Sequence, residues 1–195
     1  MGKYSNIKHP ILILVRGLPG SGKTYLANEL ENTIGKNMVV MLDPDATDYE
    51  SKEYLEHTNT LTAEGLDPKI HAYRFLRGKA YEGIMSSKVI IWNQPFTNMG
   101  MFTRMITNLR TYATDHDTQL PVLIVEVEVD HNVAKTRIAQ RKAAGGHGPS
   151  DGLFERYVAD YETAAKEGYR TIAVQGHGDV SESVSAILVA LQDLR

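Results

Sequence analysis

Eight consecutive residues near the N-terminus match the pattern G-x-x-x-x-G-K-[ST], whose residue types suit phosphate binding. They are Gly17, Leu18, Pro19, Gly20, Ser21, Gly22, Lys23 and Thr24. In this pattern, glycines let backbone N–H groups surround phosphate oxygens, the lysine reaches the β- and γ-phosphates, and the final hydroxyl ligates Mg²⁺. We therefore predict that this phosphate loop (residues 17–24) binds a nucleotide, with Lys23 also acting in catalysis and Thr24 binding the metal. The alternative is a plain glycine turn.

Two carboxylates, Asp43 and Asp45, follow the second apolar run of the chain and are separated by Pro44. We expect that run to form a strand beside the strand of the phosphate loop, so that both carboxylates face the γ-phosphate. One of them could then hold the water shell of the metal, and the other could accept a proton from an attacking hydroxyl. The alternative is turn chemistry, because Asp and Pro are common where strands end.

Arg137 and Arg141 are four residues apart in a segment that reads as a helix, so they share one face. A glycine-rich loop at 145–150 follows, and we predict that residues 131–151 form a lid that closes over a nucleotide. Arginines there would neutralise the charge of a transferring phosphoryl group. The alternative is a solvated basic face, because lysines lie nearby. His147 belongs to the same loop, where a lone histidine is usually exposed.

The elements that must position these residues alternate along the chain. Apolar runs predict five strands, at 11–15, 38–42, 89–92, 122–129 and 171–174. Helical spacing of apolar residues predicts helices at 27–34, around 49–57, and at 70–85, 99–113, 132–144, 153–166 and 184–194, the last capped by Ser181 or Ser183. Alternating strands and helices predict a five-stranded parallel sheet with helices on both faces, in a single domain over residues 1–195.

Composition limits the classes of function. The chain has 195 residues, 42% hydrophobic and 23% charged, which is ordinary for a globular protein. It has no cysteine, which excludes disulfides and cysteine nucleophiles, and a net charge of −3, which provides no overall basic field for nucleic acid. No apolar run approaches about 18 residues, and the N-terminal residues lack a signal-peptide core and a myristoylation pattern, so we expect a cytoplasmic protein without membrane contact.

The sequence resembles the zeta toxin and polynucleotide-kinase-like group of small kinases in three places. These are GLPGSGKT after an apolar strand, Asp-x-Asp after the second strand, and R-x-x-x-R followed by GGH. The resemblance implies that Asp45 activates the acceptor hydroxyl and that Arg141, or else Arg137, contacts the ATP phosphates. Because zeta toxins phosphorylate an amino-sugar nucleotide and are paired with a small antitoxin, it also implies a sugar-nucleotide acceptor and an antitoxin partner.

The segment after the third strand departs from that group. Zeta toxins and polynucleotide kinases have an acidic residue where this chain reads Trp92-Asn93-Gln94-Pro95-Phe96. The resemblance therefore covers the kinase core better than the acceptor site. We expect the acceptor site to be lined by Trp92, Asn93, Gln94 and Thr97. Without an acidic residue on the third strand, Mg²⁺ must rely on Thr24, phosphates, waters and the Asp43–Asp45 pair.

Three functions remain open at this stage. The favoured one is an ATP-dependent kinase that phosphorylates a hydroxyl of a small molecule or sugar nucleotide. The second is a kinase for nucleic-acid 5′ ends, which needs a basic groove with aromatic residues. The cluster that could supply it comprises Lys69, Arg74, Arg77 and Lys79. The third is a non-catalytic ATP-binding module that acts through a partner.

Overall fold

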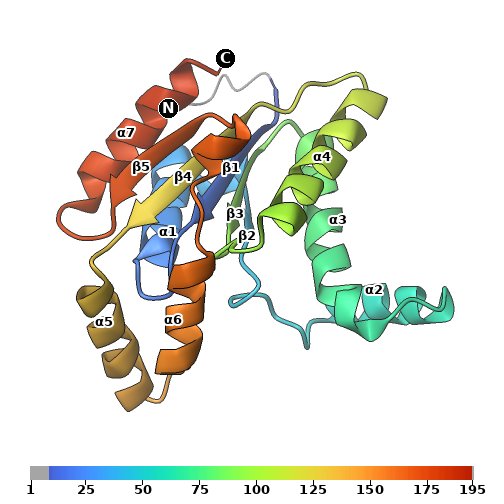
Figure 1. Ribbon diagram of the computed structural model, residues 1–195. Helices are drawn as coiled ribbons and strands as arrows, with labels where there is room; N and C mark the ends of the chain where they lie inside the picture. The colour runs from blue at the N-terminus through green and yellow to red at the C-terminus, as the bar shows by residue number, and fades with distance from the viewer. Residues whose placement is uncertain (1–8, 195) are drawn as a thin grey trace.

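The computed structural model describes residues 9–194 and contains one five-stranded sheet (Figure 1). The strands are β1 (Ile11–Arg16), β2 (Val39–Leu42), β3 (Val89–Asn93), β4 (Val122–Glu128) and β5 (Thr171–Gln175). All neighbouring pairs are parallel, and the order across the sheet is β2-β3-β1-β4-β5. The predicted fold class is confirmed. The N-terminal residues in which we found no targeting pattern, 1–8, lie outside the described part.

Helices connect successive strands and cover both faces of the sheet. They are α1 (Lys23–Ile34), α2 (Lys52–Ala63), α3 (His71–Met85), α4 (Met99–Asp115), α5 (His131–Ala143), α6 (Asp151–Asp160) and α7 (Val180–Gln192), with short 3₁₀ turns at Lys36–Met38, Pro68–Ile70 and Ala164–Glu167. Within residues 9–194, no helix combines the length and the apolar character needed to cross a bilayer.

The central strand β1 explains how two cores form on one sheet. Its residues alternate between faces, as strand geometry requires. Ile11, Ile13 and Val15 pack against α1 and α7, whereas Leu12 and Leu14 pack against α3 and α4. The five residues are at most 3% exposed, so the strand is buried on both faces, and its continuous apolar run follows from that position.

The strand order corrects one expectation. We expected the strand before Asp43 to lie beside the strand of the phosphate loop, but β2 pairs with β3, and β3 pairs with β1. Successive strands usually lie next to each other in a sheet. The connection from β1 to β2 instead leaves one position open between them, and β3 occupies that position. Asp43 therefore reaches the site from two strands away.

Several helix boundaries also differ from expectation, among them that of α2, which spans Lys52–Ala63 where we expected a helix around 49–57. The helix expected at 153–166 ends at Asp160, and the chain runs on through Tyr161 into a separate 3₁₀ turn. Helix α7 begins at Val180, before the expected start, and its cap is Asp179, whose side chain accepts a hydrogen bond from the Ser181 N–H. The expected caps, Ser181 and Ser183, lie inside the helix. Asp caps helices as well as Ser does.

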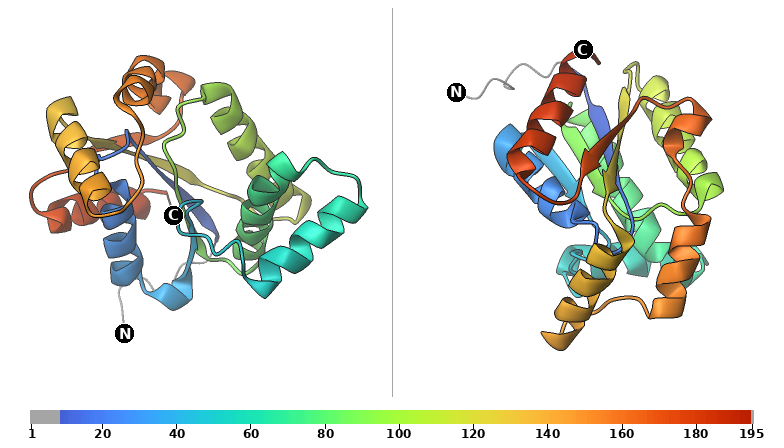
Figure 2. Two further views of the ribbon diagram at one scale, coloured as in Figure 1. Left: turned by 90° about the horizontal axis from the view of Figure 1, so that it is seen from below. Right: turned by 60° about the vertical axis from the view of Figure 1, so that its left-hand side comes forward.

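Helices α5 and α6 form a unit beyond the carboxyl ends of the strands. Leu18 of the phosphate loop, Ala134 and Ile138 of α5, and Phe154 of α6 make a separate apolar cluster. Figure 2 shows these two helices on one side of the molecule, with α2, α3 and α4 on the other. The strand ends between them are where open parallel sheets of this kind bind ligands.

Candidate active site

The phosphate loop presents free donors to a ligand. Gly22 precedes helix α1 with a φ of 95°, a left-handed conformation that favours glycine, and no side chain caps the helix. The first N–H groups of a helix lack intrahelical partners, so those of α1 are available to an anion. Gly20 is required for a second reason, because a Cβ there would lie 2.5 Å from the Ala134 carbonyl oxygen of α5.

Lys23 lies in a strongly polarised environment. Partial burial lowers the pKa of its ammonium group to about 8, although the carboxylates of Asp45 and Asp43 oppose that shift and Arg141 adds to it. Its Nζ donates a weak hydrogen bond to the Leu18 carbonyl at 3.4 Å. The lysine is therefore close to both predicted carboxylates and to the predicted lid arginine. A bound phosphate would favour the charged form of the Lys23 side chain, which burial disfavours.

Asn93 connects two residues that the sequence placed in the site separately. Its amide nitrogen donates to the Thr24 hydroxyl at 2.9 Å and to the Asp43 carboxylate at 2.6 Å. Because a carboxylate only accepts, the amide orientation is settled, and Asn93 Oδ1 is left buried without a partner among the described residues. Asn93 is 3% exposed and ends β3, which lies between β2, the strand before Asp43, and β1, the strand before the phosphate loop.

These groups fit a magnesium ion. Mg²⁺ prefers oxygen ligands and usually binds through one or two carboxylates, waters and substrate phosphates. The Thr24 hydroxyl keeps a lone pair after accepting from Asn93, and Asp43 adds a carboxylate 8% exposed beside it. The unpaired Asn93 Oδ1 is a further oxygen that lacks a hydrogen-bond donor.

Asp43 and Asp45 differ in what they can do. Asp43 uses one carboxylate oxygen to accept from the Asp45 N–H at 2.8 Å and the other to accept from Asn93. The turn chemistry that we considered as an alternative is therefore present in Asp43. The Asp45 side chain is exposed and lines the cavity in front of the phosphate loop. Of the two, Asp45 is the carboxylate accessible to a substrate hydroxyl.

One large cavity contains most of the predicted site residues. Its volume is about 820 Å³, within the usual range for small-molecule sites. The predicted residues that line it are Pro19, Gly20, Lys23, Thr24, Asp43, Asp45, Asn93, Gln94, Thr97 and Arg141. Residues of α3, α4 and α6 complete the wall, so the cavity extends from the phosphate loop into the space between the helices.

The two lid arginines have different surroundings. Arg141 lines the cavity, together with His147 and Pro149 of the loop that follows α5. Arg137 does not line it, and its Nη1 donates to the carbonyls of Gly20, at 3.2 Å, and Gly176, at 2.8 Å. Arg137 therefore joins the phosphate loop to the loop after β5, and of the two arginines Arg141 is the one that lines the cavity.

The expected acceptor wall is present in part. Asn93, Gln94 and Thr97 line the cavity, but Trp92 does not, because its side chain is fully buried against α3 and α4. The indole Nε1 donates to Gln94 Oε1 at 3.3 Å, so Trp92 supports a lining residue from behind.

The basic cluster proposed for a nucleic acid divides into two groups. Arg74 and Arg77 line the cavity, whereas Lys69 does not. Lys79 forms ion pairs with Glu53 and Glu82. The four residues therefore do not form one continuous basic groove.

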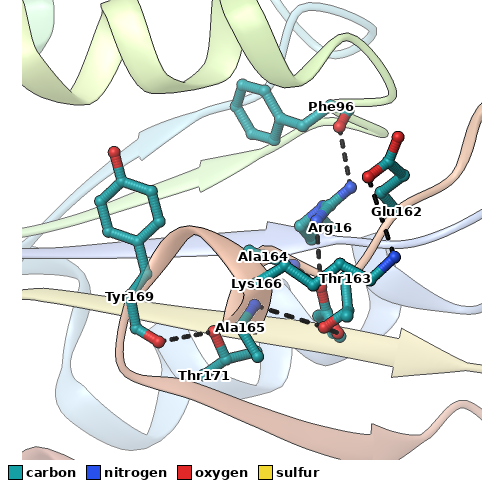
Figure 3. Close-up of polar contacts among 10 residues, drawn as sticks. Arg16, Phe96, Glu162, Thr163, Ala164, Ala165, Lys166, Tyr169 and Thr171 are labelled. Carbon is teal, nitrogen blue, oxygen red and sulfur yellow. Dashed lines mark hydrogen bonds and ion pairs between the residues drawn. The ribbon is translucent and has the colours of Figure 1, made fainter.

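A buried ion pair behind the cavity was missing from the sequence analysis. Arg16 and Glu126 are direct register partners on β1 and β4, and Arg16 Nη1 donates to Glu126 Oε1 at 3.0 Å. Arg16 Nη2 donates to the carbonyl of Phe96, a cavity residue, at 3.0 Å (Figure 3). Glu126 also accepts from the Thr163 hydroxyl and the Ala164 N–H. The pair thus joins the loop after β3 to the segment after α6.

Several solved structures of kinases share this fold. A protein from Chloroflexus aurantiacus provisionally assigned as a kinase matches with a TM-score of 0.63 and 20% identity, over 96% of this chain and 98% of that chain. A gluconokinase from Sinorhizobium meliloti matches with a TM-score of 0.56 and 19% identity, over 95% and 94%. A deoxyadenosine kinase from M. mycoides matches with a TM-score of 0.51 and 14% identity, over 93% and 99%.

At these identities the likeness establishes the fold. No curated protein matches the sequence. A family model does match: the one named AAA_33 and described as an AAA domain covers residues 12–182, so this chain belongs to the AAA_33 family.

Proposed function

We propose that the protein is a kinase that transfers the γ-phosphoryl group of ATP to a hydroxyl of a small molecule. The observation that carries the proposal is that Lys23, Arg141 and Asp45 line one cavity, with the phosphate loop at one wall. The two cations can hold a transferring phosphoryl group, and the carboxylate can orient and deprotonate an acceptor. These are the parts that phosphoryl transfer needs from a protein.

The reaction follows from those charges. The acceptor oxygen attacks the γ-phosphorus, a new O–P bond forms, and the bond from phosphorus to the β,γ-bridging oxygen breaks, which leaves ADP. Negative charge grows on the leaving and equatorial oxygens, where Lys23 and Arg141 stabilise it. The acceptor loses its proton during transfer, and Asp45 takes it, because its carboxylate has no competing hydrogen bond from a described residue.

A magnesium ion, when bound, would neutralise phosphate charge and orient the γ-phosphoryl group. Thr24 and Asp43 would hold it, with Asn93 positioning both by its two hydrogen bonds. We assign Asp43 to the metal rather than to proton transfer because both of its oxygens already accept hydrogen bonds.

Residues 131–151 are proposed as the lid. Arg141, His147 and Pro149 approach the cavity from this segment, and Lys142 Nζ secures its loop by donating to the Pro149 carbonyl at 2.6 Å. Closure would bring Arg141 onto the phosphates and exclude water, which would otherwise compete with the acceptor. Arg137 would then act indirectly, by holding the phosphate loop.

The finer proposal is a zeta toxin-like enzyme with a sugar-nucleotide acceptor and a small antitoxin as partner. It is supported by the three motif blocks that carry the resemblance and by the exposed Asp45 at the position of the family's activating carboxylate. The acceptor segment indicates a different ligand from that of the zeta toxins, because it has no acidic residue and Gln94 lines the cavity there.

Asp45→Asn tests the proposal. The substitution keeps size and removes the base, so phosphoryl transfer should fall by about 10²- to 10⁴-fold while ATP affinity stays nearly constant. Transfer would be measured with labelled ATP against sugar nucleotides, nucleosides and 5′-hydroxyl oligonucleotides. Asp48→Asn is the matched control, because Asp48 is exposed nearby and does not line the cavity.

The outcomes separate the competing functions. If Asp45→Asn leaves transfer intact and Asp43→Asn abolishes it, the two roles are reversed. Transfer to the oligonucleotides alone would identify a polynucleotide kinase. ATP binding without turnover on any acceptor would identify a binding module.

A further inference from the structure

Three arginines line the part of the cavity away from the phosphate loop. Arg74 and Arg77 come from α3 and Arg104 from α4, two helices that lie side by side (Figure 1). Within residues 9–194, no carboxylate lies within ion-pair distance of any of them, whereas Lys79 of the same helix α3 pairs with Glu53 and Glu82. Lys79 of α3 is therefore neutralised by ion pairs, whereas Arg74 and Arg77, which line the cavity from the same helix, are not.

The charge of the whole cavity is unbalanced. Five basic side chains line it, namely Lys23, Arg74, Arg77, Arg104 and Arg141, against the two carboxylates of Asp43 and Asp45. The γ-phosphate of ATP, in the proposed function, would meet Lys23 and Arg141. The three remaining guanidinium groups would still lack an anion. Arg104 is exposed, but Arg74 and Arg77 are partly buried, where a charge without a partner is costly.

The arginines are arranged as a receptor for an anion. Arg74 and Arg77 are three residues apart on one helix, so they point to the same side. The guanidinium carbon of Arg77 lies 5.7 Å from the ring centre of Tyr73 and 5.8 Å from that of Tyr81, which holds it between two aromatic rings. Its Nε is buried and has no hydrogen-bond partner among the described residues.

We propose that the acceptor is itself an anion, whose phosphate or carboxylate group binds to Arg74, Arg77 and Arg104 while its hydroxyl faces Asp45. The guanidinium fork matches both groups, since it can donate two parallel hydrogen bonds to two oxygens. The identification of the bound anion as the acceptor rests on the proposed function. Binding of the anion itself requires no catalysis.

The test is therefore a binding experiment on the protein saturated with a non-hydrolysable ATP analogue and Mg²⁺, which occupies the phosphate loop. The probes are two matched pairs: glucose 6-phosphate with glucose, and gluconate with glucitol. We expect calorimetry to detect at least one anion and to find its neutral partner about 10- to 100-fold weaker, the usual worth of hydrogen bonds to charged groups. The two pairs distinguish phosphate from carboxylate recognition.

Variants locate the site. Arg77→Gln and Arg104→Gln should each weaken the bound anion about 10-fold or more, and Arg77→Lys should retain part of the affinity because it keeps charge without the fork. Arg110→Gln is the control, because Arg110 belongs to α4 and does not line the cavity. Unchanged affinity for the ATP analogue would show that each variant is folded.

Two results would overturn the inference. One is that neutral probes bind as tightly as anions, and the other is that anions bind equally to Arg77→Gln and Arg104→Gln. Asp45→Asn separates this inference from the proposed function, because it should abolish transfer and leave anion binding intact. If anions bind in the expected way but no acceptor is phosphorylated, the kinase proposal fails and the anion site stands.

Discussion

Removing the Glu126 carboxylate should cost this protein a large part of its stability. Arg16 is fully buried and Glu126 is 7% exposed, so Glu126→Ala would leave a guanidinium charge in the core without its counter-charge. The Thr163 hydroxyl and the buried Ala164 N–H would lose their acceptor at the same time. Breaking one partner of a buried pair is far more damaging than the pair's net contribution suggests.

The magnitude follows from these losses. An orphaned buried charge costs about 3–5 kcal/mol, and a buried amide without a partner costs about 1–3 kcal/mol. The two belong to one network and do not add fully, so we expect about 4–6 kcal/mol. Total stabilities are about 5–15 kcal/mol, so the loss is a large part of the total, and the melting temperature should fall by about 10–20 °C.

Urea denaturation and calorimetry would measure the change. The control is Glu128→Ala on the same strand. The Glu128 side chain is exposed and, within residues 9–194, hydrogen-bonds only to Gln175, so its loss should stay within about 0.5 kcal/mol. The double variant Arg16→Met, Glu126→Leu should recover most of the loss, because it removes both charges. A Glu126→Ala effect below about 1 kcal/mol would refute the reasoning and would mean that water reaches Arg16.

Three further predictions concern the site. The affinity for an ATP analogue should fall as pH rises through about 8, where Lys23 of the free protein loses its proton. Binding of the analogue at that pH should take up protons, which calorimetry detects as a binding heat that depends on the buffer. Both effects should vanish in Lys23→Met. Arg141→Ala should lower kcat more than it raises the KM for ATP, and a change in KM alone would make it a binding residue. Asn93→Leu should raise the Mg²⁺ concentration needed for half-maximal turnover at least several-fold, because Thr24 and Asp43 lose the amide that joins them. The affinity for nucleotide in the absence of metal should not change.

The strand and the helix on either side of the phosphate loop could be predicted because the pattern that indicates them is local. The glycines, Lys23 and Thr24 are contiguous, and the strand before them and helix after them are visible as apolar periodicity. The same holds for the fold class, because each strand can be predicted from its own run of apolar residues. Features that depend on one short stretch can be inferred without knowing which stretches meet.

Trp92 and Asn93 show where a finer use of local pattern would have helped. We assigned both to the acceptor wall, and Asn93 does line the cavity, whereas Trp92 is buried against α3 and α4. Neighbouring residues of a strand point to opposite faces, so only one of the two could line the same wall. Strand alternation therefore contained the correction, and the site assignment overlooked it.

The Arg16–Glu126 pair could not be inferred in this way. Each residue is a single charge at the end of an apolar run, and nothing in either run indicates the other. They meet because β1 pairs with β4 in a register that sets them opposite each other. Strand order and register are properties of the whole sheet, so the contact is invisible until the topology is known.

The corrected strand order strengthens the role given to Asp45. Parallel strands lie about 4.8 Å apart, so β2, two positions from β1, stands about 10 Å from it. A reacting oxygen lies about 3–3.5 Å from phosphorus, and a base lies about 2.6–3.2 Å from the oxygen it deprotonates. A γ-phosphoryl group and an acceptor oxygen together therefore need more than one strand spacing between the phosphate loop and the base. Had β2 lain beside β1, Asp45 would have been too close to the loop to admit both. The intervening strand β3 provides that room, and Asn93 at its end joins Thr24 to Asp43 across it.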